Sequence, residues 1–297
     1  MRHSSRRLSL VQVDVFTLNV LEGNALAVVL NGNGVDDAEM QAIARETNLS
    51  ETTFILPRDP DIERERGIRV RIFTAREELP FAGHPTLGTA FVLRGATLSD
   101  EIKLELNVGP VLVRFEDAAG QPSFGEMTQQ QPRFGRQHQR DTLAKVLNLS
   151  LDDFAPDLPV ETVSTGLAFT IVPLRSLSVV RGLHIDHACC SAYLAETEGK
   201  FFYFVTRETV DASARLHARM LFYNGEDPAT GSAAGCTAAW MVAHGVAQPD
   251  ERVLIEQGLE ANRPSRIYVR ASREDNRVVN VRVGGHAVEI LRGELFL

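Results

Sequence analysis

A six-residue motif occurs twice in this chain, half a chain apart, and it restricts the possible folds more than any other feature. Both copies, residues 78–83 and residues 226–231, read E-x-P-x-x-G. Each copy follows a strand-like stretch that contains arginine, and each precedes a segment of small residues that favours a helix. An internal repeat at this separation predicts two copies of one domain. We therefore expect two pseudo-symmetric domains with a cleft between them, a common place for a small-molecule site.

The segments that follow the two motif copies are almost free of charge. Residues 232–244 contain no Asp, Glu, Lys or Arg, and Gly245 after them is typical of a helix end. Residues 85–94 begin with Pro85, a favoured first helical residue, and stay uncharged up to Arg94. A helix without a polar face is buried on all sides. The sequence thus predicts an α+β fold in which each domain is a curved, mostly antiparallel sheet wrapped around a central buried helix.

Apolar runs bounded by turn-forming residues predict the other elements. Strands are expected at residues 10–16, 25–30, 52–56, 68–73, 102–106, 111–115, 169–173, 201–206 and 214–222. Helices are expected at residues 37–47, 141–147 and 185–196. The tail, residues 277–283 and 287–297, is typical of paired strands that close a sheet.

The polar stretch 120–138 lacks periodicity and predicts the boundary between the two domains. We expect an N-terminal half-domain at residues 1–122 and a C-terminal half-domain at residues 123–283. The C-terminal strand, residues 284–297, is a candidate to complete the first half.

Composition excludes several classes of function. A net charge of −8 without a cluster of Lys and Arg argues against nucleic-acid binding. No run approaches the roughly 18 apolar residues that span a membrane. The basic residues 1–7 lead into a strand pattern and not into the apolar core of a signal peptide, so we expect a cytoplasmic protein. The three cysteines, Cys189, Cys190 and Cys236, lack metal-type spacing and are predicted to be buried thiols.

Glu51 is the first candidate for catalysis, because it stands where a helix ends and a strand begins. Its neighbours Leu49, Phe54 and Ile55 are apolar. Apolar surroundings disfavour the charged form of a carboxylate, which suits a group that moves a proton near neutral pH. The spacing alone leaves open that Glu51 is a solvent-facing residue at a strand end.

The starts of the two buried helices are the second candidate site. His84 follows Gly83 at one start, and Ser232 follows Gly231 at the other. Helix N-termini present unpaired N–H groups and a partial positive charge, so they bind anions. Two such ends facing one cleft would hold an acidic substrate. Ordinary roles stay open: a helix cap for Ser232, and turn residues for the glycines and for Asp227 before its proline.

The two halves agree at scaffold residues and differ at polar residues. His84 corresponds to Ser232, and residues 50–52 align with residues 164–166, which contain no acid. One carboxylate in one half and polar groups in the other predict an asymmetric site on a symmetric scaffold.

Several stretches together resemble the PhzF family of phenazine-biosynthesis isomerases, within the diaminopimelate epimerase fold superfamily. The most specific are Glu-Leu-Pro-Phe-Ala-Gly-His-Pro at residues 78–85 and Glu-Asp-Pro-Ala-Thr-Gly-Ser-Ala at residues 226–233. The other matching stretches are residues 14–16, 23–28, 48–54, 255–258 and 263–265. The resemblance therefore covers essentially the whole chain.

This resemblance implies roles for the motif residues. The catalytic positions fall here on Glu51, His84, Asp227 and Ser232, with Glu51 as the acid/base. The predicted substrate-binding residues are Gly83, Gly231, Thr230 and Ser50. It also implies a homodimer without cofactor or metal. The family's reaction converts trans-2,3-dihydro-3-hydroxyanthranilate to a keto isomer by moving a proton between ring carbons, so we expect a small carboxylate-bearing substrate.

Two other functions stay open. A racemase or epimerase of amino-acid-like acids would use one thiol at each helix start, but these positions hold His84 and Ser232, and Cys236 lies about one turn beyond. The other is a non-catalytic relative that binds small acids. Residues 222–225 before Glu226 form a short approach, which we expect to lie over the substrate.

Overall fold

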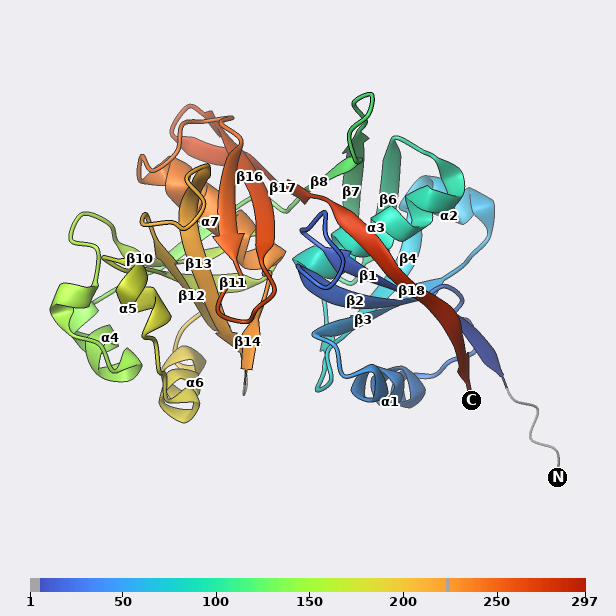
Figure 1. The fold of residues 1–297 in the computed structure, drawn as a ribbon, viewed down its shortest axis with the longest axis horizontal. Helices are drawn as coiled ribbons and strands as arrows, with labels where there is room; N and C mark the ends of the chain where they lie inside the picture. The colour runs from blue at the N-terminus through green and yellow to red at the C-terminus, as the bar shows by residue number, and fades with distance from the viewer. Residues whose placement is uncertain (1–5, 223–224) are drawn as a thin grey trace. The chain divides into compact units, whose positions relative to one another are not determined.

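The computed structural model describes residues 6–222 and 225–297. The chain forms two compact units (Figure 1). Unit 1 comprises Met1–Met127 and Gly284–Leu297, and unit 2 comprises Thr128–Val283. The sequence-based boundary was placed after residue 122. Residues 223 and 224, within the stretch expected to lie over the substrate, are outside the described residues.

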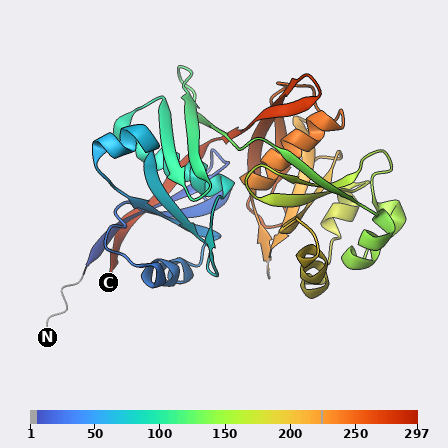
Figure 2. The same cartoon turned by 180° about the vertical axis from the view of Figure 1, so that it is seen from behind.

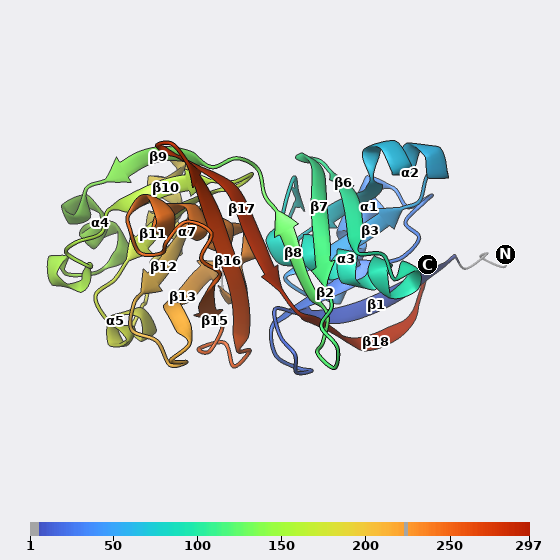
Figure 3. The same ribbon diagram turned by 90° about the horizontal axis from the view of Figure 1, so that it is seen from above.

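Unit 1 is a curved sheet around a helix. Its strands are β1 (Arg7–Val15), β2 (Asn24–Val29), β3 (Glu51–Leu56), β4 (Ile68–Phe73), β5 (Glu78–Leu79), β6 (Glu101–Leu106), β7 (Gly109–Glu116), β8 (Phe124–Thr128) and β18 (Ala287–Phe296). Its helices are α1 (Asp37–Thr47), α2 (Pro60–Arg66) and α3 (Gly83–Thr97). Neighbouring strands pair in the order β18-β1-β2-β3-β4-β6-β7-β8, antiparallel except for the parallel pairs β2–β3 and β4–β6. Helix α3 packs against β1, β2, β3, β6, β7 and β18 (Figure 3).

Unit 2 repeats this arrangement. Its strands are β9 (Arg133–His138), β10 (Val160–Ser164), β11 (Ala168–Pro173), β12 (Phe201–Thr206), β13 (Ala214–Phe222), β14 (Gly225–Asp227), β15 (Val253–Gln257), β16 (Ser265–Glu274) and β17 (Arg277–Gly285). Its helices are α4 (Arg140–Leu147), η1 (Leu151–Asp153), α5 (Leu177–Arg181), α6 (His187–Ala195) and α7 (Gly231–Ala243). The pairing order is β9-β10-β11-β12-β13-β15-β16, with parallel pairs β11–β12 and β13–β15. Helix α7 packs against β10, β11 and β16.

The two units therefore share one topology. Strands β1 to β4 with α3, β6 and β7 correspond in order and direction to β10 to β13 with α7, β15 and β16. The predicted α+β fold, with a sheet around a buried helix in each half, is confirmed. The alignment of residues 50–52 with 164–166 was wrong, because residue 164 ends β10, the counterpart of β1, whereas Glu51 begins β3, whose counterpart is β12.

The glutamate of each motif copy closes a hairpin. Glu78 on β5 accepts two hydrogen bonds from Arg71 on β4, at 2.8 and 2.7 Å. Glu226 on β14 accepts two from Arg219 on β13, at 2.9 and 2.8 Å. Such bidentate pairs fix geometry as well as adding energy. The repeated Glu and the arginines before it are thus scaffold residues that place Gly83 and Gly231 at the starts of α3 and α7.

Three expectations need correction. Residues 120–138 were expected to be irregular, yet they contain β8 and β9, which pair with β7 and β10. The two tail segments were expected to be paired strands, but β17 and β18 belong to different units, and β18 pairs with β1, as the red and blue ends of the chain show (Figure 1 and Figure 2). Residues 284–297 lie in unit 1, in agreement with their candidacy to complete the first half. Strand pairing is non-local, so local sequence patterns do not specify it.

The third correction concerns the cysteines. Cys190 and Cys236 are buried, but Cys189 is exposed. Cys189 and Cys190 are neighbours on α6, and successive helical residues point about 100° apart because a turn takes 3.6 residues. Cys190 packs into the core of unit 2, so Cys189 faces solvent. Within the described residues, no helix is long and apolar enough to cross a membrane.

Candidate active site

Glu51 and His84 lie together inside unit 1. Glu51 is the first residue of β3, just after α1 has ended at Thr47, and His84 is the second residue of α3. The Glu51 side chain is 10% exposed and that of His84 is 3% exposed, and Glu51 Oε2 lies 3.3 Å from His84 Nε2. This burial rules out the solvent-facing alternative for Glu51. Ser50, the residue before β3, is half-buried.

The environment of His84 keeps its ring neutral. Burial lowers the pKa of His84 from 6.5 to about 3, because a charged imidazolium loses its hydration inside the unit. The other ring nitrogen, Nδ1, lies 3.1 Å from the amide nitrogen of Asn24, which is also buried. His84 can therefore donate a hydrogen bond at neutral pH, but it carries no positive charge there.

The two helix starts are built alike. The N-cap of α3 is Ala82 and that of α7 is Thr230, and neither provides a side-chain cap hydrogen bond. The alternative in which Ser232 caps α7 is therefore wrong: Ser232 is the second helical residue and is buried. Uncapped N–H groups at a helix start suit an anionic ligand.

Asp227 is held by an oriented hydrogen-bond network in unit 2. The Thr230 hydroxyl donates to Asp227 Oδ2 at 2.6 Å. Gln257 Nε2 donates to the Asp227 carbonyl oxygen at 2.7 Å and to Thr230 Oγ1 at 3.0 Å. On its other side, Gln257 Oε1 accepts from the Tyr203 hydroxyl at 2.8 Å and from the Thr230 N–H at 3.1 Å. These bonds set the direction of the Asp227 carboxylate before any ligand arrives.

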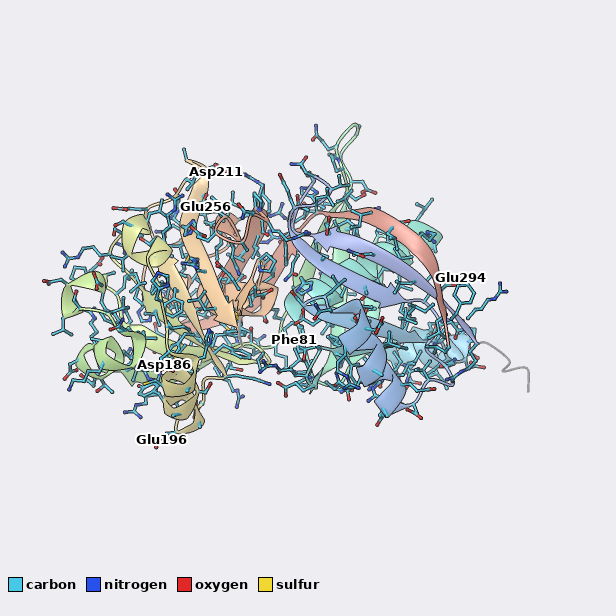
Figure 4. The ribbon with its side chains drawn as sticks, turned by 60° about the horizontal axis from the view of Figure 1, so that its bottom comes forward. Phe81, Asp186, Glu196, Asp211, Glu256 and Glu294 are labelled. Atoms are coloured by element: carbon cyan, nitrogen blue, oxygen red, sulfur yellow. The ribbon has the colours of Figure 1, made fainter. Side chains whose placement is uncertain are left out.

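The strand that carries Gln257 is itself anchored. The carboxylate of the preceding residue, Glu256, accepts from the N–H groups of Val210 and Asp211 at 2.6 and 2.7 Å. Glu256 and Asp211 are labelled side by side in Figure 4. Glu256 Oε1 also lies 2.9 Å from Nδ1 of the fully buried His217. Because these contacts hold both oxygens of the Glu256 carboxylate, the position of Gln257 beside it is well defined.

Close packing also surrounds the start of α7. Gln129 Nε2 donates to the Gly231 carbonyl oxygen at 3.0 Å, and a Cβ at Gly235 would lie 1.9 Å from Gln129 Oε1. Gly235 is therefore needed for the approach of Gln129. Cys236, the next residue, is fully buried, and burial raises the pKa of its thiol to about 11. A thiol in that state is a poor nucleophile and a poor base at neutral pH.

The structure thus gathers the predicted residues into two groups, one in each unit. The group in unit 1 consists of Ser50, Glu51, Gly83 and His84. The group in unit 2 consists of Asp227, Thr230, Gly231 and Ser232. In the described parts of the chain, no three His, Cys, Asp or Glu side chains are placed to hold a metal ion.

The sequence argument missed the residues that support these groups. Asn24 and Gln257 stood within stretches that carried the family resemblance, but nothing in the pattern assigned them a contact. Tyr203 was read as part of a strand. Gln129 lay in the stretch expected to be irregular, so no local signal could have found it.

Acid should destabilise the protein through His84. The unfolded chain takes up a proton on this residue below about pH 6.5, whereas the folded protein resists it down to about pH 3. The associated stability is present above pH 6.5 and is lost as pH falls, by about 1.4 kcal/mol per pH unit and so about 3 kcal/mol at pH 4. Urea unfolding from pH 7.5 to pH 4 measures it.

His84→Gln is the matched control for this effect. It removes the titrating ring while other titrating groups, such as the buried His138, remain. Its free energy of unfolding should fall less steeply with acid than that of the wild type. Equal slopes in the two proteins would show that His84 is not kept neutral by folding.

Comparison with known proteins identifies the family. The family described as "Phenazine biosynthesis-like protein", which covers PhzC and PhzF, matches residues 13–293. The chain belongs to the PhzF family. A trans-2,3-dihydro-3-hydroxyanthranilate isomerase of Pseudomonas chlororaphis is 34% identical to this PhzF-family protein, over 97% of this chain and 99% of the relative. An uncharacterized isomerase of Mesorhizobium japonicum is 37% identical, over 96% of this chain and 97% of the relative.

The fold agrees with this assignment. The crystal structure of a PhzF-family phenazine biosynthesis protein of Bacillus anthracis matches with a TM-score of 0.87 and 25% identity, over 98% of this chain and all of that one. The family resemblance read from the motifs is confirmed, and the protein is an isomerase of the PhzF family.

Proposed function

We propose that this PhzF-family isomerase moves a proton between carbons of a small carboxylate-bearing substrate, as in the isomerisation of trans-2,3-dihydro-3-hydroxyanthranilate, without a cofactor. Glu51 is the acid/base in this proposal. The observation that carries it is the buried Glu51 carboxylate, 3.3 Å from a neutral His84 ring. The relatives named for that isomerisation support the choice of substrate class.

The proposed reaction needs one proton carrier. Glu51 takes a proton from one ring carbon, and the electron pair of that C–H bond enters a shifted double bond. Glu51 then returns the proton to another carbon, so the carboxylate is regenerated. No electron is gained or lost overall. A single positioned acid/base typically contributes about 10²–10⁴-fold to such a step.

We further propose that each group of site residues takes part in substrate binding. The N–H groups at the uncapped helix starts, near Gly83 in unit 1 and near Gly231 in unit 2, suit a carboxylate. The other binding residues in this proposal are Ser50, Asp227, Thr230 and Ser232. Thr230 and Gln257 already orient Asp227, which supports its proposed role in substrate binding. A hydrogen-bond acceptor that is fixed before the ligand binds loses little conformational entropy on binding. We also propose that the protein is a cytoplasmic homodimer.

A two-thiol racemase has less support. Cys236 is held protonated by burial and contacts the Thr165 hydroxyl at 3.4 Å, also inside unit 2. The residues at the two helix starts, His84 and Ser232, are not thiols. Neither helix start therefore carries the thiol that a two-thiol mechanism would need.

Proton exchange in deuterated water tests the function. With trans-2,3-dihydro-3-hydroxyanthranilate, we expect conversion to an isomer, followed by NMR and mass spectrometry. The aromatic analogue 3-hydroxyanthranilate has no migrating hydrogen on a saturated carbon, so it should bind and raise the melting temperature without exchange. Exchange only at the α-carbon of amino-acid-like acids would favour the racemase. Binding of these acids without any exchange would favour the non-catalytic relative.

A further inference from the structure

Asn24 is a buried polar residue beside the proposed site that the mechanism above does not use. It begins β2, is 1% exposed, and its backbone pairs with Val15 on β1. Gly23 before it has a φ of +64°, and a Cβ there would lie 2.3 Å from the Val15 carbonyl oxygen. Only glycine fits such a conformation and approach without strain. The backbone of Asn24 is therefore held in one place, from which its side chain reaches His84.

The contacts of the imidazole favour one tautomer. A neutral imidazole has one nitrogen that donates and one that accepts, and burial keeps His84 neutral, with a pKa of about 3. Nδ1 lies 3.1 Å from the amide nitrogen of Asn24, and because an amide N–H group can only donate, Nδ1 is the acceptor. With Nδ1 as the acceptor, the ring hydrogen belongs on Nε2, which lies 3.3 Å from Glu51 Oε2 without a hydrogen bond between these two atoms. The contact with Asn24 thus selects the tautomer.

We propose that Asn24 is a positioning residue that holds His84 in the tautomer with its hydrogen on Nε2, so that the nitrogen nearest Glu51 already bears a hydrogen and cannot take a proton from it. This inference rests on the proposed function, in which Glu51 carries the migrating proton. The residue acts only through His84 and needs no contact with the substrate.

The tautomer decides what happens to the migrating proton. When Glu51 has taken it, Nε2 of the neighbouring ring already bears a hydrogen and has no lone pair for another. The proton therefore returns to the substrate. In the opposite tautomer Nε2 would accept the proton from Glu51, and the migrating hydrogen would then be lost more often to solvent.

Nitrogen NMR of the ring tests the tautomer in the free protein. In ¹⁵N-histidine-labelled wild type, His84 should show a protonated Nε2 and an unprotonated Nδ1, without change from pH 5 to pH 8. Asn24→Asp replaces the donor by an acceptor of nearly the same shape, so Nδ1 should gain a hydrogen. Asn33→Asp makes the same chemical change at an exposed turn of unit 1 and should leave the His84 signals unchanged. A wild-type ring with its hydrogen on Nδ1 would overturn the proposal, and this measurement requires no variant to fold.

Measurements of turnover then test whether the His84 tautomer affects transfer of the migrating proton. With substrate deuterated at the migrating position, wild type in ordinary water should carry deuterium into the product. Asn24→Asp should carry over less of it and lose on the order of 10- to 100-fold in kcat, the size of effect known for hydrogen-bond partners that orient metal-binding histidines. Unchanged deuterium transfer in a folded Asn24→Asp protein with an altered tautomer would refute the role of Asn24. Lack of turnover in wild type would instead refute the proposed function and leave the tautomer result standing.

Discussion

Glu51→Gln should remove nearly all isomerase activity and leave the fold intact. Glutamine has almost the same shape as glutamate and can stay in the same buried position at the start of β3. Its amide cannot take a proton from carbon, because it lacks the basicity of a carboxylate. We expect kcat to fall by at least about 10²-fold, the lower end for loss of a general acid/base.

The measurement is proton exchange and product formation, together with the melting temperature and ligand binding of each variant. Glu46→Gln is the matched control, because Glu46 lies five residues earlier on the exposed side of α1. It should keep full activity. Near-normal turnover in Glu51→Gln would contradict the mechanism, and a lower melting temperature with no ligand binding would point to a structural role for Glu51.

Gly258→Ala should cause a large loss of stability close to the proposed site. Gly258 has a φ of +80°, and a Cβ there would lie 2.3 Å from the Arg263 carbonyl oxygen and 2.5 Å from that of Pro228. Both contacts are with backbone, which cannot rotate away. We expect a loss of about 3–5 kcal/mol in the free energy of unfolding, which places it among the most damaging substitutions. Activity should fall too, because Pro228 follows Asp227 and Gly258 follows Gln257.

Gly34→Ala separates the two causes of this loss. Gly34 has almost the same φ, +82°, but a Cβ there would have no atom within 4 Å. Its loss should therefore reflect backbone strain alone, about 1–2 kcal/mol. Urea unfolding of the two variants gives the difference. Equal losses would show that the crowding around Gly258 is relieved by small shifts and does not constrain the Asp227 loop.

Much of the local structure could be read in advance. Residues 68–73, 201–206 and 214–222 form strands, and residues 37–47 form a helix, with the bounds expected from their patterns. The two uncharged helices were also found, because a segment without a polar face has no stable place except a core. Helix α2 was missed, since none of its residues is buried and it carries no apolar periodicity.

The residues of the candidate site also fall into those that the sequence predicts and those that only the structure reveals. Glu51, His84 and Asp227 could be named in advance because a repeated motif and a distinctive family pattern mark their positions. Their supporting contacts could not be named. Asn24 and His84 are 60 residues apart in the chain, and Gln129 and Gly231 are 102 apart. No short-range pattern records which side chains the sheets bring together across such separations.

The amino-acid pattern alone was enough for the duplicated architecture, the buried helices and the family, because motifs, their recurrence and periodicity can be read along the chain without knowledge of its contacts. Folding was needed to decide that β18 pairs with β1, that Cys189 faces solvent, and that Asn24 and Glu51 lie on opposite sides of the His84 ring. These features arise from pairing and packing of distant segments. The protonation state of His84 is also decided by the tertiary structure, because burial of the ring away from water lowers its pKa.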